Sequence, residues 1–278
     1  MLEGSREKPV TSSTRLYFIA AVLFSIAIMS SPATQAIAQD DNAPTILITG
    51  ANRGIGFEFA RQYAEKYWNV IATCRDPDAA VELRSLAERR PNVVVEQLDV
   101  TDHAMIDALA EKLEGQAIDV LLNNAAIVGG SPDQFFGQID HRRFDSFMQT
   151  NALGPLKMAE AFYQHVKASQ QKKIANLSSL VGSTAYKGGR MPGAYFYKGS
   201  KAALDIFMFT LAGDVKKDGI TVVLLGPGIV NTGRLRSGSI PGIVDIEKSV
   251  GGLIAVIERL TLDDTGKYFR HTGEEADY

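Results

Sequence analysis

The sequence contains little of several residue types, and each shortage excludes a class of protein. Cys74 is the only cysteine among 278 residues, so no disulfide can form within the chain. The four histidines are scattered without metal-ligand spacing, which argues against a structural metal site. The formal net charge is only −3 and no basic block is present, so nucleic-acid binding has no electrostatic support. Residues 43–278 also contain no internal repeat, and their length predicts a single domain.

An apolar segment near the N-terminus differs from the rest of the chain. Residues 16–29 are uncharged and mostly apolar, follow a basic start, and precede the small-x-small triplet 36–38. This order predicts a signal peptide within residues 1–42, cleaved after Ala38, and export to the periplasm or the medium. The run is shorter than the roughly 20 residues of a membrane-spanning helix, so an uncleaved anchor is the alternative. A cytoplasmic product that starts at Met29 also remains open.

Beyond residue 42, strand-like apolar runs alternate with helical patterns. The expected strands are 45–49, 69–74, 93–98, 118–123, 173–178, 220–225 and 266–270. The expected helices are 55–66, 78–89, 102–113, 140–168, 197–217 and 247–260. Such alternation predicts an α/β fold, a single Rossmann-type doubly wound parallel sheet with helices on both faces. In this architecture ligands bind at the carboxyl ends of the strands.

A glycine-rich turn, residues 50–56, follows the first expected strand and leads into the first expected helix. Strand, glycine turn and helix together form the context of a dinucleotide-binding fingerprint. The glycines let the backbone approach a pyrophosphate, and the helix N-terminus offers free N–H groups and a positive dipole end. The sequence therefore predicts a nicotinamide cofactor held by Gly50, Asn52, Arg53, Gly54, Ile55 and Gly56.

The end of the second expected strand bears on the choice of cofactor. Arg75 follows this strand, and Arg53 lies in the glycine turn. Two guanidinium groups near the adenosine ribose favour a 2′-phosphate, and hence NADP(H) over NAD(H). Asp76 leaves NAD(H) open, because an acidic residue here can bind a free ribose.

Tyr197 and Lys201 form a Tyr-x-x-x-Lys pair at the start of an apolar helical run. A four-residue step places both side chains on one helix face, one turn apart. A nearby ammonium lowers the pKa of a phenol, so the pair is a candidate general acid/base for carbonyl and alcohol chemistry.

With these features the chain from about Thr45 onward resembles the short-chain dehydrogenase/reductase family. The matching motifs, in order, are Thr-Gly-Ala-Asn-Arg-Gly-Ile-Gly at 49–56, Leu-Asp-Val-Thr at 98–101, Asn-Asn-Ala-Ala at 123–126, Asn151 in 150–155, Asn-Leu-Ser-Ser at 176–179, the Tyr-Lys pair, and Pro-Gly at 227–228. Ala126 stands where the family usually has glycine. Some segments further resemble a subgroup of sniffer-like carbonyl reductases and C-factor-like proteins, which implies NADPH-dependent carbonyl reduction.

The resemblance implies roles for the matched residues. Ser179 would hydrogen-bond the reacting oxygen, Tyr197 would transfer the proton, and Lys201 would also anchor the nicotinamide ribose. Asn151 would hold a water of a proton relay. The implied cofactor contacts, beyond the glycine turn and Arg75, are Asp99, Val100, Asn124, Ala125, Tyr197, Lys201, Pro227, Gly228 and Thr232.

Several alternatives remain at this level. Ser178 is adjacent to Ser179 and could take its place, and Tyr195 is a neighbouring tyrosine without a lysine four residues later. The function could instead be NAD-dependent alcohol oxidation, or C-factor-like nucleotide binding and signalling with little turnover. The expected partner is a small carbonyl or alcohol substrate, and Phe207, Phe209 and Leu211 belong either to the core or to a homodimer face.

Overall fold

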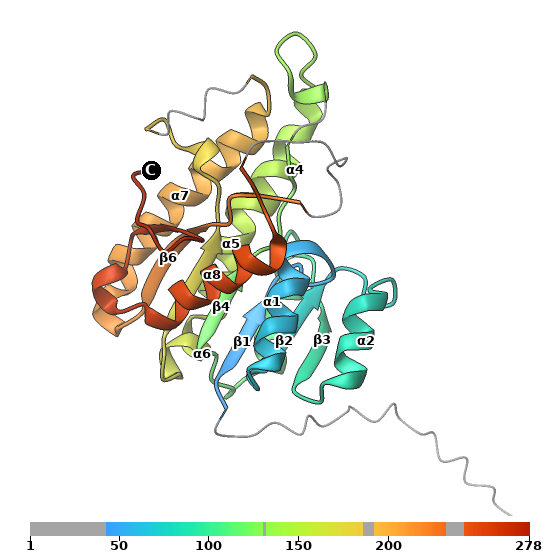
Figure 1. The fold of residues 1–278 in the computed structure, drawn as a ribbon, viewed down its shortest axis with the longest axis vertical. Helices are drawn as coiled ribbons and strands as arrows, with labels where there is room; N and C mark the ends of the chain where they lie inside the picture. The colour runs from blue at the N-terminus through green and yellow to red at the C-terminus, as the bar shows by residue number, and fades with distance from the viewer. Residues whose placement is uncertain (1–42, 130–131, 186–191, 232–241) are drawn as a thin grey trace, which may run out of the picture. The chain divides into compact units, whose positions relative to one another are not determined.

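The computed structural model describes residues 43–129, 132–185, 192–231 and 242–278. The predicted signal segment and Thr232 therefore lie outside the described residues. In the described part, seven parallel strands form one sheet in the order β3-β2-β1-β4-β5-β6-β9 (Figure 1). Their bounds are β1 Thr45–Ile48, β2 Asn69–Cys74, β3 Val93–Gln97, β4 Val120–Asn123, β5 Lys173–Leu177, β6 Thr221–Gly226 and β9 Tyr268–Arg270. This is the predicted Rossmann-type sheet, with its reversal of strand order between β1 and β4.

Helices cover both faces of this sheet (Figure 1). One face carries α1 Gly54–Glu65, α2 Val81–Arg89 and α8 Ile246–Arg259. The other carries α3 His103–Lys112, α5 Gly154–Ala161, α6 Tyr163–Ala168 and α7 Tyr195–Val215. The short strands β7 Ile229–Val230 and β8 Ile243–Val244 pair separately from the main sheet.

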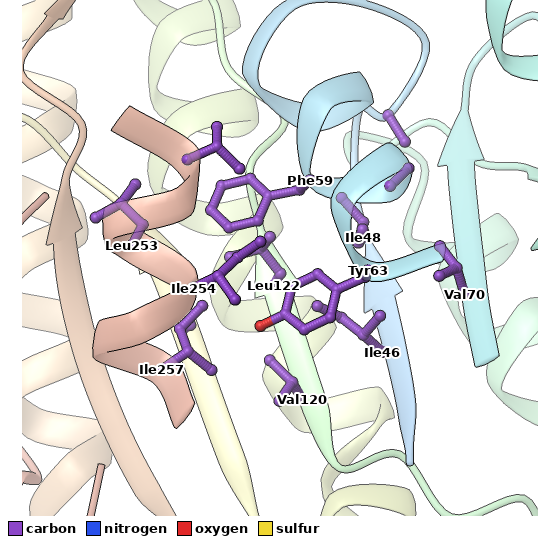
Figure 2. Close-up of a cluster of buried hydrophobic side chains, with 14 of the residues drawn as sticks. Ile46, Ile48, Phe59, Tyr63, Val70, Val120, Leu122, Leu253, Ile254 and Ile257 are labelled. Carbon is purple, nitrogen blue, oxygen red and sulfur yellow. The ribbon is translucent and has the colours of Figure 1, made fainter. Parts of the chain in front are cut away.

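The hydrophobic core consists of two layers because strand side chains alternate between the two faces. On β1, Ile46 and Ile48 belong to one layer and Leu47 to the other. Figure 2 shows the first layer, where Phe59 and Tyr63 of α1 meet Ile254 of α8 over β1 and β4. All of these side chains are buried, so the strands are held on both faces and their carboxyl ends form a fixed edge.

The predicted helix 140–168 is wrong as a continuous element. The chain instead forms a short 3₁₀ turn, α4 Phe144–Met148, a π-helical turn Gln149–Leu153, and then α5 and α6. A π turn adds a residue to the helical repeat and rotates the following side chains. The apolar pattern continues through these breaks, so periodicity alone did not reveal them.

The helix carrying Tyr197 begins at Tyr195, two residues earlier than expected, after Ala194 in the left-handed region (φ 56°). Of the apolar residues considered for a dimer face, Phe207 and Leu211 pack against the core, whereas Phe209 is 57% exposed. Within the part of the chain that the structure describes, no helix is long and apolar enough to cross a membrane. The same residues contain no group of three or more His, Cys, Asp or Glu arranged to hold a metal ion.

Candidate active site

The glycine turn joins β1 to α1 in a conformation that its glycines permit. Gly50 and Gly54 have positive φ angles of 67° and 58°, which side-chain-bearing residues adopt only at a cost. At Gly56 an added Cβ would lie 2.4 Å from the carbonyl oxygen of Gly50. Arg53, the N-cap residue of α1, makes no side-chain hydrogen bond to the helix. The first N–H groups of α1 are therefore left for an anionic ligand, as a pyrophosphate requires.

Asn124, at the end of β4, braces this turn from the neighbouring strand. Its side-chain amide donates to the carbonyl oxygens of Thr49 at 2.8 Å and Gly50 at 3.0 Å. The Thr49 hydroxyl in return accepts from the backbone N–H groups of Asn124 and Ala125, at 3.0 and 3.1 Å. The motif beginning at Asn123 thus holds the turn in shape. Ala126 follows without a positive φ, which explains why alanine can replace glycine there.

The expected ribose end of the site lies beside β2. Arg53 and Arg75 are both exposed and both line the same cavity. Asp76 also lines it, but one of its carboxylate oxygens accepts from the backbone N–H of Ala79 at 3.0 Å. Two guanidinium groups therefore face this end of the cavity beside a carboxylate that is engaged in a local turn.

Helix α7 brings Tyr197 to the carboxyl edge of the sheet, against the end of β5. Ser179, two residues past β5, lies close enough to the Tyr197 phenol to lower its pKa by hydrogen bonding. Ser178 lines the same cavity, but its side chain is buried and its hydroxyl donates to the carboxylate of Asp205 at 2.5 Å. Of the two adjacent serines, Ser179 is the one in contact with the phenol of Tyr197.

The ionisation of the Tyr-Lys pair differs from the expectation. Burial raises the pKa of the Tyr197 phenol above its ordinary value, although the hydrogen bond to Ser179 acts in the opposite direction. Burial also lowers the pKa of Lys201 to about 8. The Lys201 ammonium donates to the carbonyl oxygen of Leu177 at 2.7 Å. Desolvation is thus the largest influence on both groups, and Tyr197 is a protonated phenol at neutral pH.

One cavity of about 370 Å³ runs from the glycine turn to the Tyr-Lys pair. The predicted residues that line it are Gly50, Asn52, Arg53, Gly54, Ile55, Gly56, Arg75, Asp99, Val100, Asn124, Ala125, Tyr197, Lys201 and Pro227. Ser179, Asn151 and Gly228 are not among its lining residues. Gly228, with φ 80°, packs instead close to His271.

Asn151 lies in the π-helical turn with its side chain fully buried. Its amide nitrogen donates to the Ile127 carbonyl and the Ser200 hydroxyl, both at 2.9 Å, and its oxygen accepts from the Ile127 N–H at 2.7 Å. These bonds tie β4 and its following loop to α7, next to Lys201. The side-chain polar atoms of Asn151 are thereby occupied by protein groups, and a relay water at this residue remains a prediction.

Three further residues near the pair were not anticipated from sequence. Gln134 is buried and its side-chain oxygen accepts from the backbone N–H of Tyr197 at 3.2 Å. Gly129 lies so close to Tyr197 that an added Cβ would be 2.8 Å from the tyrosine Cβ. Asp205 stands one turn beyond Lys201 and is 5% exposed. Of the three, only Asp205 could have been identified from the sequence. It is an acidic residue on an apolar helix, four residues after Lys201, just as Lys201 is four residues after Tyr197.

A doubly wound parallel sheet with a glycine turn at its first helix is typical of nucleotide-dependent oxidoreductases. The short chain dehydrogenase family model matches residues 44–239. The protein belongs to this family of oxidoreductases.

The similar proteins agree with this assignment. An uncharacterised oxidoreductase of Schizosaccharomyces pombe is 30% identical over 250 residues, spanning 84% of this chain and 96% of its own. An NADPH-bound carbonyl reductase from chicken fatty liver superimposes with a TM-score of 0.75 at 32% identity, covering 85% of this chain and 99% of its own. The carbonyl reductase Sniffer of D. melanogaster also gives a TM-score of 0.75, at 28% identity, covering 85% and 100% of the two chains.

Proposed function

We propose that this protein is an NADP(H)-dependent oxidoreductase that interconverts a carbonyl and an alcohol through Ser179, Tyr197 and Lys201. The proximity of Ser179 to the phenol of Tyr197, which lines the cavity together with Lys201, carries the proposal. It brings together two hydroxyl groups, one able to hold a carbonyl oxygen and the other able to exchange a proton with it.

The residues of the site fit a reduction. NADP(H), when bound, supplies the hydride to the carbonyl carbon. Ser179 donates a hydrogen bond to the carbonyl oxygen and holds it while negative charge develops there. Tyr197 then delivers its phenolic proton to that oxygen, and its raised pKa keeps this proton in place at neutral pH. Lys201, fixed by the carbonyl of Leu177, places a positive charge near the resulting phenolate.

The glycine turn and the expected ribose end of the cavity support NADP(H) as the cofactor. The backbone at Gly50 and Gly56 leaves no room for a side chain, so a pyrophosphate would approach the N-terminus of α1 directly. Arg53 and Arg75 would bind a 2′-phosphate, and their positions along the cavity favour NADP(H) over NAD(H). The NADPH-bound protein from chicken fatty liver and Sniffer of D. melanogaster are both named carbonyl reductases. Their names support carbonyl compounds as the substrate class of this protein.

The proposal is tested by following NADPH oxidation with a panel of aldehydes, ketones and quinones. Turnover that Ser179→Ala lowers by about 100-fold at unchanged NADPH affinity would support the proposed site. Tight NADPH binding without turnover on the whole panel would instead indicate a C-factor-like binding protein. Faster alcohol oxidation with NAD would indicate the NAD-dependent alternative.

The two arginines give a separate prediction for cofactor choice. Arg53→Ala and Arg75→Ala are each expected to weaken NADPH binding by about tenfold, because each removes one charge-assisted hydrogen bond to the phosphate. NADH, which lacks this phosphate, should bind these variants and the parent protein equally. The measurement is the dissociation constant of each cofactor from nicotinamide fluorescence.

Arg84 provides the matched control for this prediction. It is an exposed arginine on α2 that does not line the cavity, so Arg84→Ala changes the net charge equally without touching the site. An equal loss of NADPH affinity in Arg84→Ala would show a general charge effect and contradict the assignment of Arg53 and Arg75.

A further inference from the structure

Asp205 is a buried carboxylate inside the helix that carries the Tyr-Lys pair. Tyr197, Lys201 and Asp205 follow one another at four-residue steps on α7, so their side chains lie along one helix face. Asp205 is 5% exposed, and burial raises the pKa of its carboxyl group to about 6. Burying a carboxylate costs free energy unless a partner compensates its charge. A buried carboxylate beside catalytic groups is therefore a candidate for a functional role.

The surroundings of Asp205 connect it to the catalytic groups. The Ser178 hydroxyl donates to its Oδ1 at 2.5 Å, and Ser178 directly precedes Ser179. On α7 its charge acts on Tyr197 and Lys201. From other elements it faces Tyr268 of β9 and Tyr278 near the C-terminus, whose pKa values are raised by burial and, to a lesser extent, by its charge. Lys201 is thus the cation on which this carboxylate acts.

We propose that Asp205 is a positioning residue of the active site, whose carboxylate holds Ser178 at the end of β5 and keeps Lys201 protonated beside Tyr197. The inference rests on the proposed function, since it assigns Asp205 to the same Ser-Tyr-Lys site. Two opposing influences act on Lys201: burial favours loss of its proton, and the Asp205 charge favours its retention. The negative charge likewise favours the protonated phenol of Tyr197.

The sign of the expected pH dependence follows from this charge. Asp205→Asn preserves shape and an oxygen that can accept from Ser178, but it removes the negative charge. Both Lys201 and Tyr197 should then lose their protons at lower pH, by about one pH unit, because a nearby negative charge favours the protonated form of each. Because carbonyl reduction needs the protonated phenol, the alkaline limb of the kcat/KM profile should move down by the same amount.

The test measures the titration of Lys201 directly, in addition to activity. In protein labelled with ¹³C-lysine, the Lys201 side-chain signal is assigned by its loss in Lys201→Arg. In the parent protein this signal should show an inflection near pH 6, where Asp205 titrates. In Asp205→Asn the inflection should vanish and the Lys201 midpoint should fall by about one unit.

Two further variants separate the charge from packing. Ser178→Ala removes the hydrogen bond that favours the carboxylate, so the Asp205 inflection should move to higher pH while the alkaline limb stays in place. Asp214→Asn removes an exposed carboxylate from the same helix and should leave the Lys201 titration unchanged. If Asp205→Asn fails to fold, the parent and Ser178→Ala titrations still decide the question.

The inference is overturned if the parent shows no inflection near pH 6, or if Lys201 titrates identically in the parent and in Asp205→Asn. A shifted Lys201 titration in a protein that reduces no carbonyl would support the electrostatic coupling and contradict the proposed function instead. The two failures are therefore distinguishable.

Discussion

Tyr197→Phe is expected to lower kcat for carbonyl reduction by about 10³-fold, the middle of the range for loss of a general acid. The variant loses only the hydroxyl that meets Ser179, and its side chain continues to pack beside Gly129. NADPH affinity should therefore change by less than about threefold. One hydroxyl is a small part of the proposed cofactor-binding surface, which extends along the cavity to the glycine turn. Steady-state kinetics and NADPH titration measure the two effects separately.

Tyr195→Phe is the matched control for this experiment. Tyr195 lies two residues earlier on the same helix, is 48% exposed, and does not line the cavity. It should keep the parent turnover. Parent-like turnover in Tyr197→Phe, or an equal loss in Tyr195→Phe, would contradict the assignment of Tyr197 as the proton donor.

Gly56→Ala is expected to lower kcat/KM on the order of 100-fold by displacing the cofactor turn. The new Cβ would lie 2.4 Å from both the Gly50 carbonyl oxygen and the Asn124 side-chain nitrogen. Either the turn or the Asn124 brace must move, and both position the backbone that would meet the pyrophosphate. The same overlap should reduce the free energy of unfolding by about 1–3 kcal/mol.

Gly213→Ala tests whether this effect is specific to the turn. Gly213 lies in α7, and an added Cβ there meets no atom within 4 Å. Alanine is a better helix former than glycine, so this variant should gain up to about 1 kcal/mol of stability and keep parent NADPH affinity. NADPH titration and urea denaturation of both variants provide the comparison, and unchanged NADPH affinity in Gly56→Ala would contradict the turn's role.

Much of the fold and of the candidate site could be predicted because it depends on residues close together in the chain. The strand-turn-helix of residues 45–65 is recognisable from an apolar run, three glycines and a helical pattern. The shared face of Tyr197 and Lys201 follows from helix geometry alone. The alternation of elements was sufficient for the parallel sheet, whose strands appear within a few residues of the predicted bounds.

The breaks in 140–168 were not predictable in this way. The π-helical turn there directs Asn151 inward, where it bonds to Ile127 and Ser200. These partners lie 24 and 49 positions away, so the local apolar pattern contains no trace of them. The tertiary contact outweighs the regular helical repeat at this point.

The sequence by itself determined which chemical groups the site contains and how neighbours in one turn or one helix are spaced. The tertiary structure decided their partners and their ionisation, since both depend on burial and on distant segments. Ser179 rather than Ser178 meets Tyr197 because Ser178 is bonded to Asp205, 27 positions later. Burial likewise reverses the expected direction of the Tyr197 pKa shift, because desolvation outweighs the favourable effect of its hydrogen bond.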